Sequence, residues 1–172
     1  MPWQKHKLNA VARGLWSANE QKLELKQSSI FINNKEQNIK GWWKEKLFEL
    51  DTTLRELPIS LTDAFQDYIV GGNVSGTVLA QGNFSNPILK TNLHANTQFK
   101  KQAVSVSLEG EGDFDSFKVE DAFIKLGTAQ LKTSGTLFTK RQTMDLQVHQ
   151  LSGPVRIVEV FDVVFPDDLY ID

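Results

Sequence analysis

The sequence predicts a mainly β fold of antiparallel strands, and three observations support this prediction. Apolar and polar residues alternate in many short segments, such as Lys-Leu-Glu-Leu-Lys at residues 22–26. Polar or glycine-containing turns separate these segments at regular intervals. Residues 68–89 carry no charge, and their middle part alternates in the same way. Together these patterns indicate about eight to twelve short strands in an antiparallel arrangement.

The uncharged stretch at residues 68–89 is not a membrane-spanning helix. It contains several glycines and asparagines and Pro87, so it lacks the roughly 20 consecutive apolar residues that such a helix needs. We predict a strand that is opened by Gly71-Gly72 and closed by Gly82-Asn83. Because neither face of this strand carries a charge, we expect both faces to contact protein or apolar material.

The first third of the chain follows the same β pattern. Residues 6–16 predict a first strand, and strands at 22–26, 30–32 and 39–43 follow, with a polar turn at 33–36. Residues 44–57 remain ambiguous between a helix and a strand, because leucines at 47, 50, 54 and 57 fit a helical stripe whereas 48, 50, 52 and 54 fit a strand. Residues 60–70 are the best candidate for one short helix, since Ser60 or Thr62 can cap it.

The second half of the chain carries the clearest alternation. We predict strands at residues 89–95, 104–108, 122–126, 129–132 and 144–148. The expected turns are 96–98, 109–113, 127–128 and 140–142.

We expect residues 1–172 to form a single β-rich segment of a longer chain. Leu57-Pro58 and Phe165-Pro166 close two similar runs of apolar residues, which indicates a weak internal repeat. The segment would then hold about one and a half repeats, with a possible junction near residues 58–88.

Composition excludes several functional classes. The formal net charge of −2 provides no basic surface for nucleic acid, and the absence of cysteine excludes thiolate metal sites and cysteine nucleophiles. The histidines at 6, 94 and 149 have no metal-ligand spacing, and no nucleophile elbow or phosphate loop is present. We therefore predict no catalytic residue, no metal and no cofactor. The acidic run at positions 109, 111, 113 and 115 suits a solvated turn better than a calcium site.

What remains is one apolar face that recurs on almost every predicted strand. It can be the closed core of a sandwich or barrel, or the open inner face of an elongated, curled sheet that holds lipid chains. The residues that we expect to line such a groove are Leu23, Leu25, Val74, Val78, Leu93, Val104, Val106, Leu108, Ile124, Leu126, Leu131, Leu146 and Val148.

The order of motifs resembles the TamB family, the large envelope proteins of the bacterial AsmA-like group. The similar elements are Leu-Pro at 57–58, the glycine-interrupted strand over 72–82 and Asn-Pro at 86–87, followed by Leu-Lys-Thr-Ser-Gly-Thr-Leu-Phe at 131–138. The resemblance covers about residues 6–172, and no catalytic residue is carried over with it.

The resemblance implies an elongated, groove-shaped β-sheet in the periplasm, within a parent chain that is anchored in the inner membrane of a Gram-negative bacterium. It also implies transport of phospholipid toward the outer membrane, or support of outer-membrane protein and autotransporter assembly with a TamA-type barrel partner. The alternative is a chaperone-like module that binds unfolded outer-membrane strands by pairing with a sheet edge. An enzyme, such as an all-β hydrolase, would need a polar cleft with converging acids and histidines.

Overall fold

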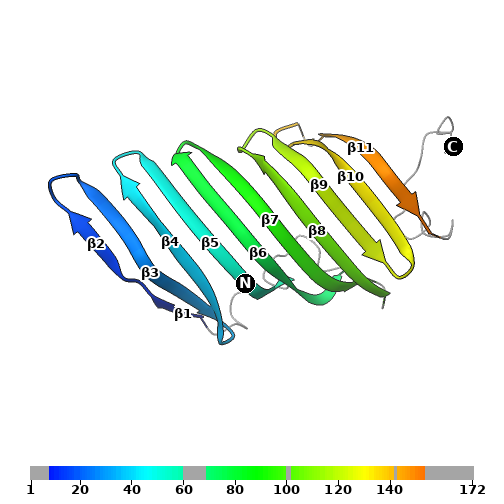
Figure 1. Ribbon diagram of the computed structural model, residues 1–172, viewed down its shortest axis with the longest axis horizontal. Helices are drawn as coiled ribbons and strands as arrows, with labels where there is room; N and C mark the ends of the chain where they lie inside the picture. The colour runs from blue at the N-terminus through cyan, green and yellow to red at the C-terminus, as the bar shows by residue number, and fades with distance from the viewer. Residues whose placement is uncertain (1–7, 60–68, 100–101, 142, 154–172) are drawn as a thin grey trace.

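The computed structural model describes residues 8–59, 69–99, 102–141 and 143–153. They form one antiparallel sheet of eleven strands, which curls without closing on itself (Figure 1). The strands are β1 (Leu8–Val11), β2 (Gly14–Ser17), β3 (Lys22–Ile32), β4 (Lys35–Lys44), β5 (Leu47–Pro58), β6 (Ile69–Asn83), β7 (Asn86–Phe99), β8 (Gln102–Gly112), β9 (Phe117–Leu126), β10 (Ala129–Phe138) and β11 (Thr143–Ser152). The predicted fold class is therefore confirmed.

The topology is a simple meander. From β3 to β11 each strand pairs with the next one along the chain, so the sheet order follows the sequence. β1 and β2 both pair with β3 and together form one edge, and β11 forms the other. Meanders arise from short turns between alternating strands, which is the pattern that the sequence shows.

β1 and β2 lie along the same edge of the sheet and are separated by residues 12–13. The prediction of a single strand over residues 6–16 was therefore wrong. Opposite the interruption, β3 has a bulge between Leu25 and Ser28. The carbonyl of Arg13 accepts a hydrogen bond from the Lys26 amide (3.0 Å), and the Arg13 amide donates a hydrogen bond to the Ser28 hydroxyl (3.3 Å). The interruption is thus matched to the bulge rather than being a frayed end.

Residues 47–58 are strand β5, which resolves the ambiguity of that region in favour of the strand. The residues before Pro58 pair on both sides with other strands, and these ladders outweigh the leucine spacing that suggests a helix. The expected helix over 60–70 falls mainly outside the described residues, and its last two positions already belong to β6.

Two predicted turns are instead parts of long strands. Residues 96–98 lie inside β7, and residues 109–112 belong to β8, so the turn between β8 and β9 starts only at Asp113. The turns at 127–128 and after Phe138 lie where they were expected. The two-residue turn at Asn33-Asn34 has positive φ at both residues (50° and 65°), as a type I′ hairpin requires.

Glycines allow neighbouring strands to approach closely on one face. At Gly76 a Cβ atom would lie 2.1 Å from the carbonyl oxygen of Asn92, and at Gly135 it would lie 2.1 Å from that of Asp145. Both residues have φ near +140° (141° and 145°), a conformation that other residues rarely adopt. Together with the β-bulges in several strand pairs, these glycines let a single sheet curl.

Candidate functional site

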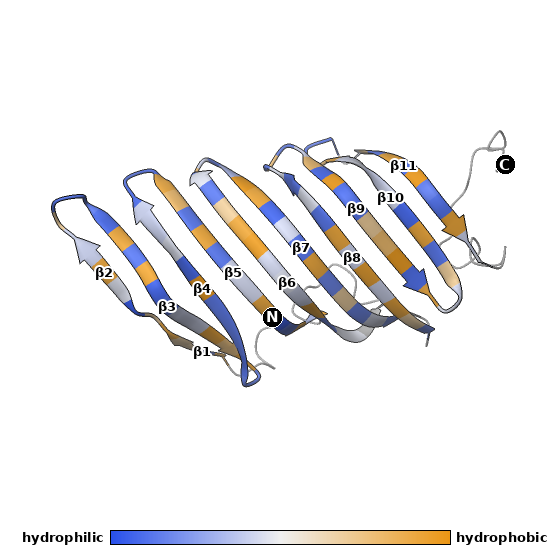
Figure 2. Ribbon diagram, viewed as in Figure 1, coloured by the Kyte–Doolittle hydropathy of each residue, from blue (hydrophilic) through white to orange (hydrophobic). Residues whose placement is uncertain are grey.

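The register of the strands gathers the apolar residues on one face, which we call the inner face. One row of directly paired residues runs across seven strands as Leu57, Val74, Ala95, Val106, Ile124, Leu131 and Leu151. The neighbouring row is Leu54, Gly76, Leu93, Leu108, Ala122, Thr133 and Val148. Figure 2 shows the resulting alternation of hydrophobic and hydrophilic residues along the strands. The strands therefore present a continuous apolar surface across the sheet.

Burial shows that the sheet curls toward this inner face. The buried hydrophobic residues are Ile32, Phe48, Val119, Ala122, Leu126 and Ala129, and the register places all of them on it. Among the described residues no second layer packs on the sheet, so only curvature can shield one face from solvent. The shielding is incomplete, because no large side chain of the described residues falls below 2% exposure.

The opposite, outer face carries the charges. Lys40 pairs with Asp51 (3.2 Å), and Lys90 with Glu111 (2.8 Å), each with its direct cross-strand neighbour. The Lys90 ammonium group lowers the pKa of Glu111 by hydrogen bonding and charge, and Glu111 in turn raises the pKa of Lys90. In the described strands, the paired rows of the inner face contain a single charged residue, Lys35, which lies next to a turn and forms an ion pair with Glu56.

Three buried polar residues interrupt the inner face, and each one lies at an irregularity of the sheet. They are Ser28, Gln37 and Thr133. The Ser28 hydroxyl accepts a hydrogen bond from the Arg13 amide at the gap between β1 and β2. The Thr133 hydroxyl donates to the carbonyl of Gln147 (2.8 Å), beside the bulge that follows Lys132.

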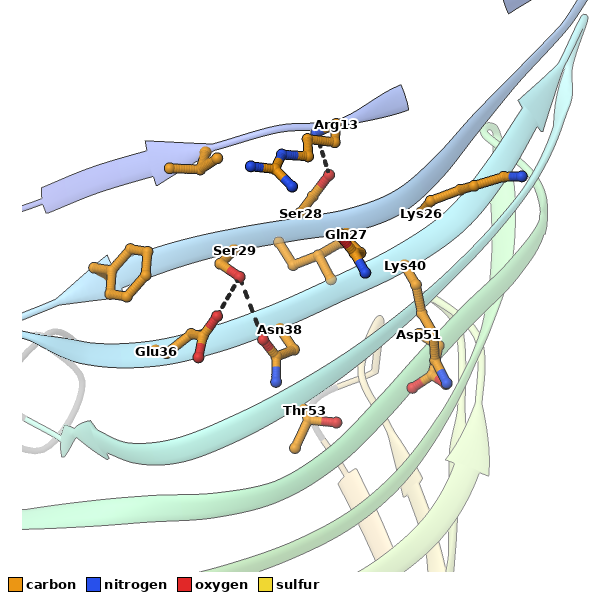
Figure 3. A pocket seen from close by; sticks show the side chains of 13 residues that line it. Arg13, Lys26, Gln27, Ser28, Ser29, Glu36, Asn38, Lys40, Asp51 and Thr53 are labelled. Atoms are coloured by element: carbon orange, nitrogen blue, oxygen red, sulfur yellow. Dashed lines mark hydrogen bonds and ion pairs between the residues drawn. The ribbon is translucent and has the colours of Figure 1, made fainter. Parts of the chain in front are cut away.

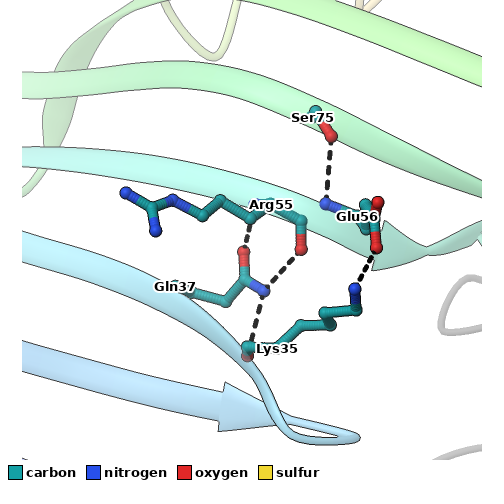
Figure 4. A network of polar contacts seen from close by, with 5 residues as sticks. All are labelled: Lys35, Gln37, Arg55, Glu56 and Ser75. Atoms are coloured by element: carbon teal, nitrogen blue, oxygen red, sulfur yellow. Dashed lines mark hydrogen bonds and ion pairs between the residues drawn. The ribbon is translucent and has the colours of Figure 1, made fainter.

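Gln37 shows most clearly how a buried polar side chain bonds to the backbone at an irregularity of the sheet (Figure 4). It is only 3% exposed. Its Oε1 accepts the Arg55 amide (2.7 Å), while its Nε2 donates to the carbonyls of Arg55 (3.0 Å) and Lys35 (3.2 Å). Arg55 lies in the β5 bulge between Leu54 and Leu57, where the regular ladder is broken. These three buried polar side chains thus bond to backbone atoms at irregularities of the sheet.

All thirteen residues expected to line a groove lie on the inner face. Leu23 and Leu25 come from β3, Val74 and Val78 from β6, and Leu93 from β7. The remaining eight come from the second half of the sheet: Val104, Val106, Leu108, Ile124, Leu126, Leu131, Leu146 and Val148. Strict period-two spacing within each strand explains the agreement, because side chains two positions apart point to the same face.

Several inner-face residues escaped the sequence-based list. Phe48, Leu50 and Leu54 lie on it, but their segment could not be distinguished from a helix. Val119 and Ala122 also lie on it, although a bulge at Glu120 shifts their spacing from two to three. A pattern search that allows one inserted residue per strand would have found the second pair.

The acidic, serine and histidine side chains that could bind a metal or take part in catalysis are dispersed over the described strands and turns. Glu109 and Glu111 point outward from β8, whereas Asp113 lies in the following turn, where its carboxylate accepts the amides of Asp115 (2.8 Å) and Ser116 (2.9 Å). Ser134 and His149 share a hydrogen bond of 2.6 Å in an exposed position. Within the described part of the chain, no group of three acidic or histidine residues could hold a metal ion.

A hollow of about 510 Å³ lies on the outer face beside the interrupted edge strand (Figure 3). Arg13, Lys26 and Lys40 contribute cations to its wall. The charged ends of Arg13 and Lys26 lie well apart in Figure 3, and Lys40 is paired with Asp51. Because these groups do not converge on one point, we do not consider the hollow a ligand site.

Comparison with known proteins gives no match: no protein-family model, curated protein or solved structure is significantly similar to this chain. In the ranges that the structure describes, no helix is long and apolar enough to cross a membrane.

Proposed function

We propose that this chain is a non-enzymatic segment of a hydrophobic β-groove that holds the acyl chains of phospholipids. In this proposal it belongs to a TamB-like protein of the periplasm and helps to move lipid between the inner and outer membranes. The observation that carries the proposal is the inner face, which is apolar across ten neighbouring strands and only partly shielded by the rest of the described chain.

An acyl chain suits this surface physically. Each CH₂ group removed from water gains about 0.8 kcal/mol, and contact with aliphatic side chains supplies this gain without any specific polar group. A surface that repeats leucine, valine and alanine from strand to strand also gives an acyl chain similar contacts along its length. The buried side chains of Gln37 and Thr133 bond to backbone beside bulges, whereas the buried hydroxyl of Thr91 on the same face has no hydrogen-bond partner.

Native mass spectrometry and lipid extraction of the purified chain test the proposal. We expect phospholipid to co-purify with the wild type, and Val106→Asp or Leu131→Glu to reduce it at least tenfold. Ser107→Asp is the matched control, because Ser107 neighbours Val106 in β8 but points to the outer face. A wild type that carries no lipid, or equal lipid loss in Ser107→Asp, would contradict the proposal.

The alternative, capture of an unfolded strand by edge pairing, is favoured by one observation. Every residue of β11 is exposed, and no described residue pairs with its outer edge. Unpaired edges offer a row of free amides and carbonyls to another strand. Lipid-free protein that binds peptides of alternating apolar and polar residues would favour this alternative.

A further inference from the structure

Five hairpin tips follow one another along one edge of the sheet, the upper edge in Figure 1. They are the turns at residues 18–21, 45–46, 84–85, 113–116 and 139–141, and we call this edge the tip rim. Successive tips are two strands apart, so the rim extends over about 40 Å at a strand spacing of about 4.8 Å.

Exposed hydrophobic side chains gather at the tip rim. Those in its turns or within four residues of them are Leu15, Trp16, Trp43, Leu47, Phe84, Ile88, Phe114 and Met144. The other large hydrophobic side chains that stay exposed lie on β1, β3 or further along β11. The described turns of the opposite edge are Asn33-Asn34 and Gly127-Thr128, and by the same criterion they have one exposed large hydrophobic residue nearby, Ile30. Among the described turns, exposed hydrophobic side chains are therefore concentrated at the tip rim.

The apolar residues of the tip rim lie on both faces of the sheet. Trp16 and Trp43 are on the inner face, whereas Leu15 and Leu47 are on the outer face. Away from the rim the outer face is polar and carries ion pairs. A rim that is apolar on both sides suits insertion into a fluid apolar phase, whereas docking on another protein would use one contiguous, well-packed patch.

The tips are also held in place. The Phe84 amide donates to the carbonyl of Lys46 (3.3 Å), and the Thr139 amide donates to that of Asp115 (3.1 Å). These two bonds fix the second tip to the third and the fourth tip to the fifth.

We propose that the tip rim docks on the surface of a lipid bilayer, with Trp16, Phe84 and Phe114 entering its interfacial region. Tryptophan and other aromatic residues concentrate at the boundary between headgroups and acyl chains, because they combine an apolar ring with tolerance of a polar environment. Lys44 lies beside the tips and Lys46 and Arg141 lie within them, where long basic side chains can reach phosphate groups. The same turns also contain Glu20, Glu45, Asp113 and Asp115, so the apolar residues and not net charge carry the proposed contact.

The rim also adjoins the inner face. Trp43 pairs directly with Phe48 and Leu23, which lie on that face. An acyl chain leaving a bilayer at the rim would meet a continuous apolar surface. The transfer of an acyl chain from the rim to the inner face rests on the proposed function, whereas docking of the exposed tips on a bilayer does not.

A flotation assay with vesicles tests the docking proposal. The wild type is mixed with phosphatidylcholine vesicles, with and without phosphatidylglycerol, and compared with the triple variant Trp16→Ser, Leu47→Ser, Phe114→Ser. The matched control is Leu8→Ser, Val11→Ser, Ile30→Ser, which removes three exposed hydrophobic residues from β1 and β3. We expect the wild type and the control to float with both vesicle types, and the tip variant to lose at least tenfold in bound fraction.

A second readout locates the contact. Because the chain has no cysteine, Phe114→Cys and Thr128→Cys each create a unique site for an environment-sensitive dye. Vesicles should blue-shift and brighten the dye at position 114, on the tip rim, and leave the dye at position 128, on the opposite edge, unchanged. Equal responses at both positions, or a wild type that does not float, would overturn the docking proposal.

The two proposals can fail separately. If the wild type floats through its tips but carries no co-purified lipid, the groove function fails and docking stands. If lipid co-purifies but the tip variant floats as well as the wild type, docking fails and the groove stands. Flotation that requires phosphatidylglycerol and ignores the tip substitutions would show adsorption by charge alone, and it would also overturn the docking proposal.

Discussion

The ring of Phe84 stacks on the ring of Phe48, with centroids 4.5 Å apart and an interplanar angle of 19°. Phe84 lies in the turn between β6 and β7, whereas Phe48 lies near the start of β5 on the inner face. The ring of Trp43 completes the cluster in a T-shaped contact with Phe84, with centroids 5.6 Å apart. Three aromatic residues from two hairpins therefore cover the inner face where it meets the tip rim.

We expect Phe84→Ala to lower the free energy of unfolding by about 1 kcal/mol, because it removes the stacked pair. Phe48→Ala should cost about 3 kcal/mol, since Phe48 is buried and its loss leaves a cavity. Urea denaturation measures both. Phe114→Ala is the control, because that exposed ring has no aromatic partner among the described residues; a cost for Phe84→Ala no larger than for this control would argue against the cluster.

Gln37→Leu should destabilise the protein, although it makes the inner face more apolar. The substitution leaves the Arg55 amide without its 2.7 Å acceptor in the β5 bulge, and an unsatisfied buried donor costs about 1–3 kcal/mol. Gln81→Leu, on the outer face of β6, should change the unfolding free energy by less than about 0.5 kcal/mol. Hydrogen exchange at the Arg55 amide should accelerate in Gln37→Leu only. Unchanged exchange there would show that the side chain is not what protects this amide.

Gly76→Ala should lower stability by about 2 kcal/mol, because Gly76 has both a positive φ and a backbone oxygen where a Cβ atom would lie. Gly71 provides the comparison, since its φ is also positive (69°) but nothing lies within 4 Å of its Cβ position. Gly71→Asn should therefore be much milder in the same thermal or urea unfolding experiment. Equal effects of the two substitutions would mean that close strand approach contributes nothing at Gly76.

Acid should weaken the turn between β8 and β9. The amides of Ser116 and Asp115 hold the pKa of Asp113 below its ordinary value of 3.8. A carboxyl group with a lowered native pKa stabilises the fold above its unfolded pKa, and this contribution disappears as the pH falls through the native value. Stability should therefore decline below about pH 4. Asp113→Asn keeps an acceptor oxygen without titrating, so its unfolding free energy should fall less over the same range in urea titrations at successive pH values. An identical decline in both proteins would exclude Asp113 as a contributor.

Period-two alternation identified the strands of the second half and all thirteen inner-face residues that were listed from the sequence. The reason is local: a residue's neighbours at i ± 2 determine which residues share its face, as for Val104, Val106 and Leu108 in β8. The same rule failed where a bulge changes the spacing. It could not connect Val119 with Ala122, and it did not reveal that Gln37 supports the bulge at Arg55.

Strand ends were also poorly predicted where long strands contain polar residues. Asn96 and Gln98 resemble turn residues, yet they lie on the outer face of β7 and pair with β8. Asn96 pairs with Asn73 on one side and Ser105 on the other, and Gln98 pairs with Ala103, so the ladders continue past the residues that resemble a turn. Local preference for turns was overridden by the ladders on either side.

The sequence by itself determined the strand type, the meander order and the division into an apolar and a polar face, because each depends on short-range spacing and turn chemistry. Only the tertiary structure decided that the apolar face belongs to one open, curled sheet. That outcome depends on how bulges and close glycine contacts accumulate curvature over eleven strands. The tertiary structure likewise brings five separate turns to one edge of the sheet, because residues far apart in the chain become neighbours only when every intervening strand has paired.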